Sequence, residues 1–222
     1  FKLLGTPQIF SFGEEISITR RNVRALAYYL VCQPGLVNRE ELKLLFWPEH
    51  TESKASTALR ETLSKLRGTL PDRDMLVSTS THAYFRNEDV QSDVREFIEN
   101  TQALESSLKN LSAATILPAH ITSQIRDAIN LWDGSSFLNT AKLPPTLNYT
   151  LWHDTFGQQL KLNQTHLLTT LIRHLVNSNN LTEAFHFLDL LSQDIHDDLD
   201  ITFHYGLLNS LIDNQNYTIA KT

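Results

Sequence analysis

The fold is decided by one stretch, Lys54 to Leu70, which has the sequence KASTALRETLSKLRGTL. Its apolar residues recur at intervals of three and four, which places them on one side of an α-helix. This apolar stripe consists of Leu59, Leu63, Leu66 and Leu70, widened by Ala55, Ala58 and Thr62. The stretch therefore predicts an amphipathic helix that packs one side against a core.

The other side of this predicted helix is polar and positively charged, because the stretch has four basic residues and a single acid, Glu61. Such side chains can reach phosphates and base edges when a helix lies in the major groove of DNA. A solvated helix face would have a similar composition, so the flanking segments have to decide between the two interpretations. The candidate DNA-contacting residues of this helix are Lys54, Ser56, Thr57, Arg60, Glu61, Ser64, Lys65 and Arg67.

Two further helices are predicted before the basic one. Apolar residues at helical spacing run from Arg21 to Cys32, and Pro34-Gly35 ends that helix. The second helix begins at Arg39 and ends at Trp47-Pro48, because a residue before proline is driven out of the α region. Asn38 is expected to cap it in a capping box with Glu41. This order of helices is typical of helix-turn-helix DNA-binding proteins.

Short β-prone runs flank the three helices. Met75 to Ser80 and Ala83 to Arg86, separated by Thr81-His82, predict a hairpin that would serve as a wing. Thr79, Thr81 and His82 at its tip are further candidate DNA contacts. An N-terminal β-sheet is predicted from Lys2 to Leu4, Gln8 to Phe12 and Ile16 to Ile18. The fold class is therefore mainly α, a winged helix-turn-helix with an N-terminal sheet and a β-hairpin wing.

The residues of this region resemble a known family. The resemblance lies in Arg24 to Ala27, Val37 to Leu42, Leu45 to Pro48 and Ala58 to Arg67. These segments are similar to the OmpR-type DNA-binding domain of the SARP (antibiotic regulatory protein) family of bacterial transcription activators. The resemblance implies that the helix 54–70 enters the major groove and that the wing 75–86 lies along the backbone or minor groove.

The second half of the chain is predicted to be almost wholly helical, with helices at 97–111, 121–132 and about 147–176 and a loop at 133–145. Residues 175–184 align with 211–220, and this 36-residue period is close to that of tetratricopeptide (TPR) helix pairs. Such pairs bury their apolar faces by stacking and leave a concave surface for partners. The predicted stripes are Leu167, Leu168, Leu171, Ile172 and Leu175; Ala184, Phe187, Leu188 and Leu191; and Phe203, Leu207, Leu208 and Leu211.

The SARP resemblance extends into this half, through Ser92 to Phe97, Ala128 to Gly134 and Phe137-Leu138. It implies two domains, a DNA-binding domain at 1–91 and a TPR-like bacterial transcriptional activation domain at 92–222. The second domain is expected to mediate self-association or contacts with RNA polymerase. Because the chain opens without Met and stops as a second repeat begins, we expect it to be an N-terminal piece of a longer protein.

Composition limits the remaining possibilities. The net charge is −6, so attraction to DNA has to come from a local patch rather than from the whole chain. The single cysteine, Cys32, excludes an internal disulfide, and no apolar run approaches the roughly 20 residues of a membrane helix. We expect a cytoplasmic protein with no membrane partner.

Chemistry-bearing motifs are absent from the sequence. It contains no Gly-rich phosphate loop, no nucleophile elbow and no paired carboxylates, and the nine histidines never reach metal-ligand spacing. We therefore expect no enzyme, no cofactor, no metal ion and no small-molecule site. The leading hypothesis is a transcription activator that binds a promoter direct repeat or half-site in double-stranded DNA. The alternative is a protein-protein adaptor whose winged helix does not bind DNA, which the acidic balance would permit.

Overall fold

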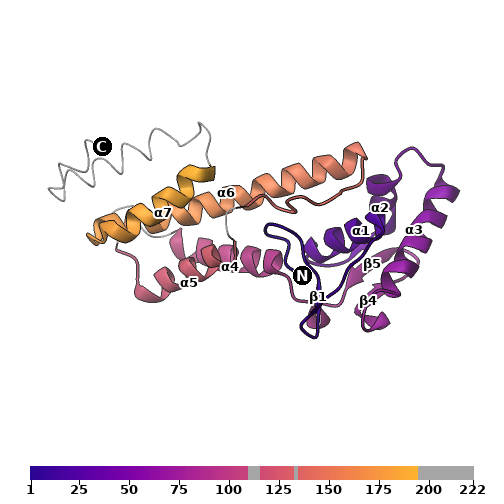
Figure 1. Ribbon diagram of the computed structural model, residues 1–222, viewed down its shortest axis with the longest axis horizontal. Coiled ribbons are helices and arrows are strands. Elements are labelled where there is room, and N and C mark those ends of the chain that lie inside the picture. Colours follow the sequence, from indigo (N-terminus) through magenta and orange to yellow (C-terminus); the bar gives the residue numbers. More distant parts are fainter. Residues whose placement is uncertain (110–115, 133–134, 195–222) are drawn as a thin grey trace. The chain divides into compact units, whose positions relative to one another are not determined.

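The structure is a computed structural model, and it describes residues 1–109, 116–132 and 135–194 (Figure 1). The described part is mostly helical, with small antiparallel sheets near the N-terminus, as predicted. It divides into two compact units, of which the first contains Phe1–Phe97 and Ser135–Gln158 and the second contains the other described residues. The predicted domain limits, 1–91 and 92–222, follow sequence motifs and stay a prediction.

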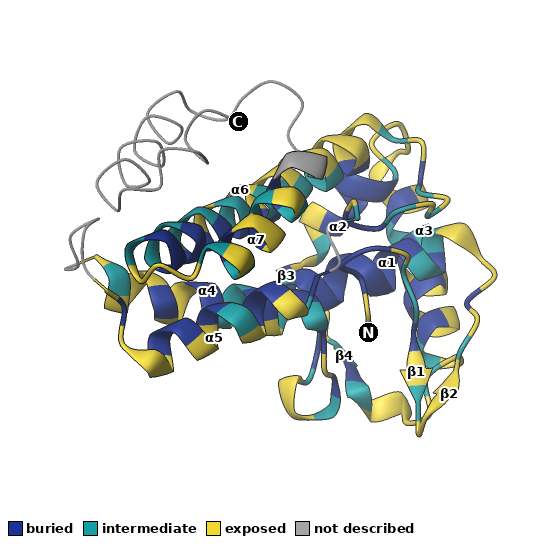
Figure 2. Cartoon of the chain, turned by 60° about the vertical axis from the view of Figure 1, so that its left-hand side comes forward, coloured by how far each residue is buried: buried dark blue, intermediate teal, exposed yellow. Residues whose placement is uncertain are grey.

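Three helices form the centre of the first unit: α1 (Arg21–Cys32), α2 (Arg39–Phe46) and α3 (Glu52–Arg67). The predicted limits of α1 and α2 are confirmed. Helix α1 packs against α3 and is buried over most of its length (Figure 2). The Cys32 thiol at its end is buried as well. The apolar pattern of α1 thus makes it the central helix against which the other two are placed.

The predicted capping box at the start of α2 is half correct. The Asn38 side chain accepts a hydrogen bond from the Glu40 backbone N–H at 2.8 Å, so Asn38 caps the helix. Glu41 does not complete the box, because its carboxylate accepts a hydrogen bond from the Tyr29 hydroxyl of α1 instead. A buried phenol needs a hydrogen-bond acceptor, and this tertiary partner takes the Glu41 carboxylate away from the cap.

The wing is confirmed as an antiparallel hairpin of β4 (Leu76–Ser78) and β5 (His82–Phe85). Its turn consists of residues 79–81, so His82 belongs to the strand rather than to the turn that was predicted. A strand that the sequence did not predict, β3 (Val37–Asn38), adds to β5, so the order in the sheet is β3-β5-β4. The Arg39 backbone N–H continues this pairing by donating to the Thr81 carbonyl at 2.8 Å.

The N-terminal sheet is smaller than predicted. It consists of β1 (Phe10–Ser11) and β2 (Glu14–Glu15), and a single bridge joins Lys2 to Gln8. Both residues of the intervening turn have positive φ, 50° at Phe12 and 86° at Gly13, which is the geometry of a tight hairpin turn. No strand forms at 16–18, where the Ile16 N–H donates to the Ile9 carbonyl at 2.7 Å and the Ile18 carbonyl accepts from the Arg24 side chain at 2.8 Å. The β-prone residues there lack a neighbouring strand with which to pair.

Residues 135–158 complete the first unit although they lie far from the winged helix in the sequence. The Thr146 hydroxyl donates to the Leu45 carbonyl at 2.8 Å, and the Leu138 N–H donates to the Leu3 carbonyl at 3.1 Å. Tyr149 is fully buried, and its hydroxyl donates to the Ala25 carbonyl of α1 at 3.1 Å. This segment therefore covers the helix-turn-helix and is part of its core.

The other helices are α4 (Asp93–Leu108), α5 (Ala119–Asn130), α6 (Leu147–Asn177) and α7 (Leu181–Asp194), and α4 and α6 each contribute residues to both units. Helix α4 begins before the predicted residue 97, because the Asp93 carboxylate accepts the Val94 N–H at its start. The first predicted stripe is buried in full, and of the second only Leu188 is half-buried. Among the described residues no helix is long and apolar enough to span a membrane.

A short turn joins α6 to α7, in which Asn179 has a φ of 60° and the Asn180 N–H donates to the Leu175 carbonyl at 2.8 Å. This helix pair corresponds to the first copy of the predicted repeat. The second copy, residues 211–220, and the third apolar stripe lie outside the described residues. The TPR-like repeat therefore stays a prediction.

A pH-dependent stability is expected for the second unit. The Nδ1 atom of His174 on α6 lies 3.0 Å from the Leu117 N–H and accepts from it, which requires an unprotonated Nδ1. Burial and the charge of Arg126 lower the pKa of His174 below its usual 6.5, and Glu183 acts in the opposite direction. Below pH 6.5 the unfolded chain therefore takes up a proton before the folded chain does, so the free energy of unfolding falls as the pH falls.

Urea unfolding at about pH 7.5 and about pH 5.5 measures this effect. His174→Gln should flatten the pH dependence, since an amide oxygen can accept the same N–H without titrating. His166→Gln, a change at an exposed histidine of the same helix, should retain it. An unchanged pH dependence in His174→Gln would show that this contact is not responsible.

Candidate nucleic-acid interface

Helix α3 presents the predicted polar face to solvent. Its packed side consists of Ala55, Leu59, Thr62, Leu63 and Leu66, all buried, and the Thr62 hydroxyl is satisfied by donating to the Ala58 carbonyl at 2.7 Å. Lys54, Thr57, Arg60, Glu61, Ser64 and Lys65 are exposed, while Ser56 and Arg67 are half-buried. The structure therefore gathers the predicted residues of this helix on one accessible surface.

The predicted limits of this helix are wrong at both ends. It begins at Glu52, before Lys54, and no side chain caps it, so the sequence carried no start signal there. It ends at Arg67, before Leu70, because the Gly68 and Thr69 N–H groups close the last turn on Ser64 and Leu66. Leu70 thus lies beyond the helix and is only half-buried. The earlier start adds a second acid, Glu52, to the helix.

The tip of the wing is held by its own side chains. The Thr79 hydroxyl oxygen accepts from the Thr81 N–H at 3.2 Å and from the His82 N–H at 3.0 Å. The Thr81 hydroxyl lies 2.8 Å from Nδ1 of His82. These contacts give the turn a fixed shape, with Thr79 and Thr81 exposed and His82 half-buried. Their part in binding DNA stays a prediction.

Three arginines gather between α3 and the wing, and we call Arg39, Arg60 and Arg67 the arginine cluster. Nη1 of Arg39 donates to the Ser78 hydroxyl at 3.0 Å and to the Thr79 carbonyl at 3.1 Å. Nε of Arg67 donates to the Leu76 carbonyl of the same strand at 3.1 Å. The cluster therefore ties the first residue of α2 and the last residue of α3 to β4.

The arginine cluster has an excess of positive charge. Burial, followed by the charges of Arg60 and Arg67, lowers the pKa of Arg39, and Glu40 offsets this only in part. An arginine stays protonated under such a shift, so the three guanidinium groups repel one another until an anion arrives. Arg60 is exposed and forms no hydrogen bond or ion pair with the described residues. Spare guanidinium donors close together are suited to phosphate and to guanine edges.

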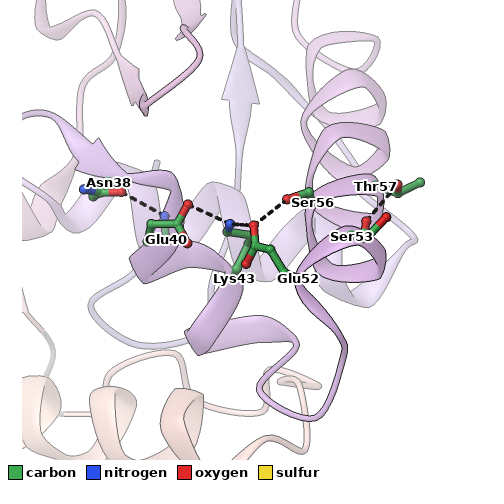
Figure 3. A network of polar contacts seen from close by, with 7 residues as sticks. All are labelled: Asn38, Glu40, Lys43, Glu52, Ser53, Ser56 and Thr57. Atoms are coloured by element: carbon green, nitrogen blue, oxygen red, sulfur yellow. Dashed lines mark hydrogen bonds and ion pairs between the residues drawn. The ribbon is translucent and has the colours of Figure 1, made fainter.

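Two residues of this surface were missed from the sequence. Arg39 was predicted only to be the first residue of a helix. A positive charge in the first turn of a helix is unfavourable because of the helix dipole, so an arginine there suggests a role other than helix formation. Glu52 was excluded by the predicted start at Lys54. Its carboxylate forms an ion pair with Lys43 of α2 and accepts from the Ser56 hydroxyl at 3.0 Å (Figure 3). By contrast, the predicted acid Glu61 pairs loosely with Lys65, at 3.4 Å.

Over the described ranges, no group of His, Cys, Asp or Glu side chains is arranged to hold a metal ion. The conspicuous geometry is therefore that of a polar, cationic helix beside a β-hairpin.

Comparisons with known proteins agree with this fold. No family model and no curated protein sequence matches the chain. Among solved structures, EmbR of Mycobacterium tuberculosis, in a complex with a low affinity phosphopeptide, matches with a TM-score of 0.60. The match covers 100% of this chain and 68% of EmbR, at 18% sequence identity. EmbR is a SARP-family regulator, and the match over the whole chain shows that this protein has a SARP-like fold, a winged helix-turn-helix followed by a helical region.

Proposed function

We propose that the chain is a winged-helix transcription regulator that binds double-stranded DNA in a sequence-specific manner and activates transcription. One observation carries the proposal: the exposed face of α3 and the β-hairpin wing are joined by the arginine cluster. Half or more of protein–DNA hydrogen bonds go to phosphate and sugar, while base edges are contacted from within a groove. A helix with exposed cationic and hydroxyl side chains, beside a fixed hairpin, supplies both kinds of contact.

In the proposed complex α3 lies in the major groove and the wing lies along the neighbouring backbone or minor groove. Arg60, exposed and unpaired among the described residues, is assigned to a base edge, where a guanidinium binds guanine in a bidentate manner. Lys65 and Arg67 are assigned to phosphates. The remaining contacts would come from Lys54, Ser56, Thr57, Glu61 and Ser64 of the helix and from Thr79, Thr81 and His82 of the wing.

The helical region is proposed to bind a second copy of the chain or RNA polymerase. The SARP-like fold supports this role, and so does the net charge of −6, because one cationic surface on an acidic protein gives weak binding by itself. Two copies on a promoter direct repeat would combine two such surfaces and gain affinity through the raised effective concentration.

A pair of single substitutions tests the assignment of base and phosphate contacts. Arg60→Ala should weaken binding to the cognate site by about 1–3 kcal/mol and relax the base preference at one position. Lys65→Ala should weaken all duplexes alike and reduce the slope of log K against log salt by about 1. Fluorescence anisotropy with a cognate and a scrambled duplex, over a series of salt concentrations, measures both effects. Unchanged binding of the Arg60→Ala chain would contradict the assignment.

The net negative charge of the chain favours one other function, that of a protein-protein adaptor whose winged helix does not bind DNA. The same titrations separate the two functions. An adaptor would show no affinity for either duplex even at low salt, and its exposed α3 residues would matter for binding a protein instead.

A further inference from the structure

The carboxylate of Glu52, at the start of α3, is held in place from α2. Lys43 is the holding residue, and only 7% of its side chain is exposed. Its ammonium group forms ion pairs with Glu40, at 2.7 Å, and with Oε1 of Glu52 (Figure 3). Because the Glu52 side chain is itself 72% exposed, an acid on an accessible surface is fixed by a buried cation.

These contacts leave two hydrogen-bond acceptors unused. Oε1 of Glu52 accepts from Lys43 and, at 3.0 Å, from the Ser56 hydroxyl, while Oε2 has no partner among the described residues. Ser56 uses its only hydroxyl proton in this bond, so its oxygen keeps only acceptor capacity. We call Glu52 Oε2 and Ser56 Oγ the acceptor pair; their residues are four positions apart and lie on one side of α3.

An acceptor pair in the major groove can be satisfied by few partners. Phosphate oxygens carry no proton and repel a carboxylate, so the pair cannot serve as a backbone contact. The only donors that base pairs present in this groove are the amino groups of cytosine and adenine. Adenine also presents N7, an acceptor, next to its amino group, which is unfavourable beside a carboxylate. Cytosine N4 is the donor to which Glu and Asp bind.

We propose that the acceptor pair selects a cytosine in the DNA site, with Lys43 as the residue that positions it. This inference rests on the proposed function, in which α3 lies in the major groove. In helix-turn-helix proteins the N-terminal residues of the recognition helix contact base edges, and Glu52 and Ser56 lie in the first turns of α3. Lys43 pairs with both Glu40 and Glu52, so it offsets part of their negative charge and lowers the electrostatic cost of bringing Glu52 near DNA.

If the Lys43–Glu52 ion pair served only to hold α2 against α3, replacing Glu52 would leave the base preference unchanged. Base preference therefore distinguishes a structural role of Glu52 from a role in reading DNA. In Glu52→Gln, the amide oxygen can still accept from the Lys43 ammonium group. The other terminal atom, Oε2 in wild type, becomes an NH₂ group that donates instead of accepting. Selection from a random pool of double-stranded DNA should give the wild-type 222-residue chain a motif with one strongly enriched cytosine. Glu52→Gln should lose about tenfold of that enrichment at this one position and keep the rest of the motif.

The matched control is Glu49→Gln, which removes the same charge from an exposed residue between α2 and α3 and should keep the cytosine. A second measurement uses the wild-type chain and a duplex in which a 2-pyrimidinone base, lacking the amino group, replaces that cytosine. Wild-type binding should weaken about tenfold, and binding by Glu52→Gln, which keeps only the Ser56 oxygen of the pair, should weaken clearly less.

Three results would overturn the inference. If wild type and Glu52→Gln select the same base at every position, or if loss of the amino group costs wild type nothing, the acceptor pair does not select cytosine, and the proposed function stands. If the folded wild-type chain selects no motif at all, the proposed function fails and this inference fails with it.

Discussion

A chain in which Arg39, Arg60 and Arg67 are all replaced by alanine is expected to bind its DNA site about a thousandfold more weakly at ~0.1 M salt. Each arginine is expected to contribute about 1.4 kcal/mol or more through a phosphate or a base contact. Arg39 also ties the wing to α2 through Ser78 and Thr79, so its loss should loosen the wing. Fluorescence anisotropy with the cognate duplex measures the change, and circular dichroism checks that the helices are retained.

The control for this variant removes the same amount of positive charge elsewhere. Lys109, Lys142 and Arg173 lie outside the arginine cluster, and replacing them with alanine changes the net charge equally. If binding depends on total charge, the two triple variants should weaken alike. We expect the control to keep nearly all of its affinity at ~0.1 M salt, because none of the three residues is a proposed DNA contact and salt screens the long-range effect of their charges. Equal losses in both variants would contradict a local arginine site.

Tyr149→Ala is expected to lower the free energy of unfolding of the first unit by about 3–5 kcal/mol, the usual cost of removing a buried aromatic ring. Tyr149 is fully buried and packs against Phe46 and Trp152, with ring centroids 5.2 Å and 5.0 Å away. The change leaves a cavity and removes the donor to the Ala25 carbonyl. Because this side chain comes from α6, the effect shows that the helix-turn-helix depends on residues far beyond the wing.

Tyr149→Phe separates the ring from its hydroxyl. It keeps the packing and removes one buried hydrogen bond, so we expect a loss of about 1 kcal/mol. Urea unfolding followed by tryptophan fluorescence measures both variants, since Trp152 lies in contact with the ring. A Tyr149→Ala chain as stable as wild type would mean that residues 135–158 do not support the winged helix.

The helices were predictable where local chemistry marks their ends. Pro34-Gly35 ends α1, Asn38 caps α2, and Pro48 forces the chain out of the helix after Phe46. The apolar stripe of α3 was enough to predict which side of the helix is packed. It did not predict the first residue of the helix, which begins without a side-chain cap. The predicted polar face was correct as a surface, because helical spacing alone decides which side chains point away from the core.

Contacts between residues far apart in the chain could not be predicted from the sequence. Strand β3 has two residues, too few for a periodic pattern, and it forms because β5 lies beside it. The partners of Arg39 on the wing lie 39 and 40 positions away, and Lys43 pairs with Glu52 across the turn between two helices. Glu41 was assigned to a cap for the same reason, since nothing local revealed that Tyr29 would bind it. Side-chain partners of this kind are decided by tertiary packing.

Selection of bound duplexes from a random DNA pool by the wild-type chain tests the central claim most directly. The account predicts one enriched motif, present as a half-site or as a direct repeat, whose enrichment is lost in Arg60→Ala at a single position and whose affinity falls steeply with salt. A folded chain that retains no duplex at low salt, or that retains all sequences equally, would contradict it.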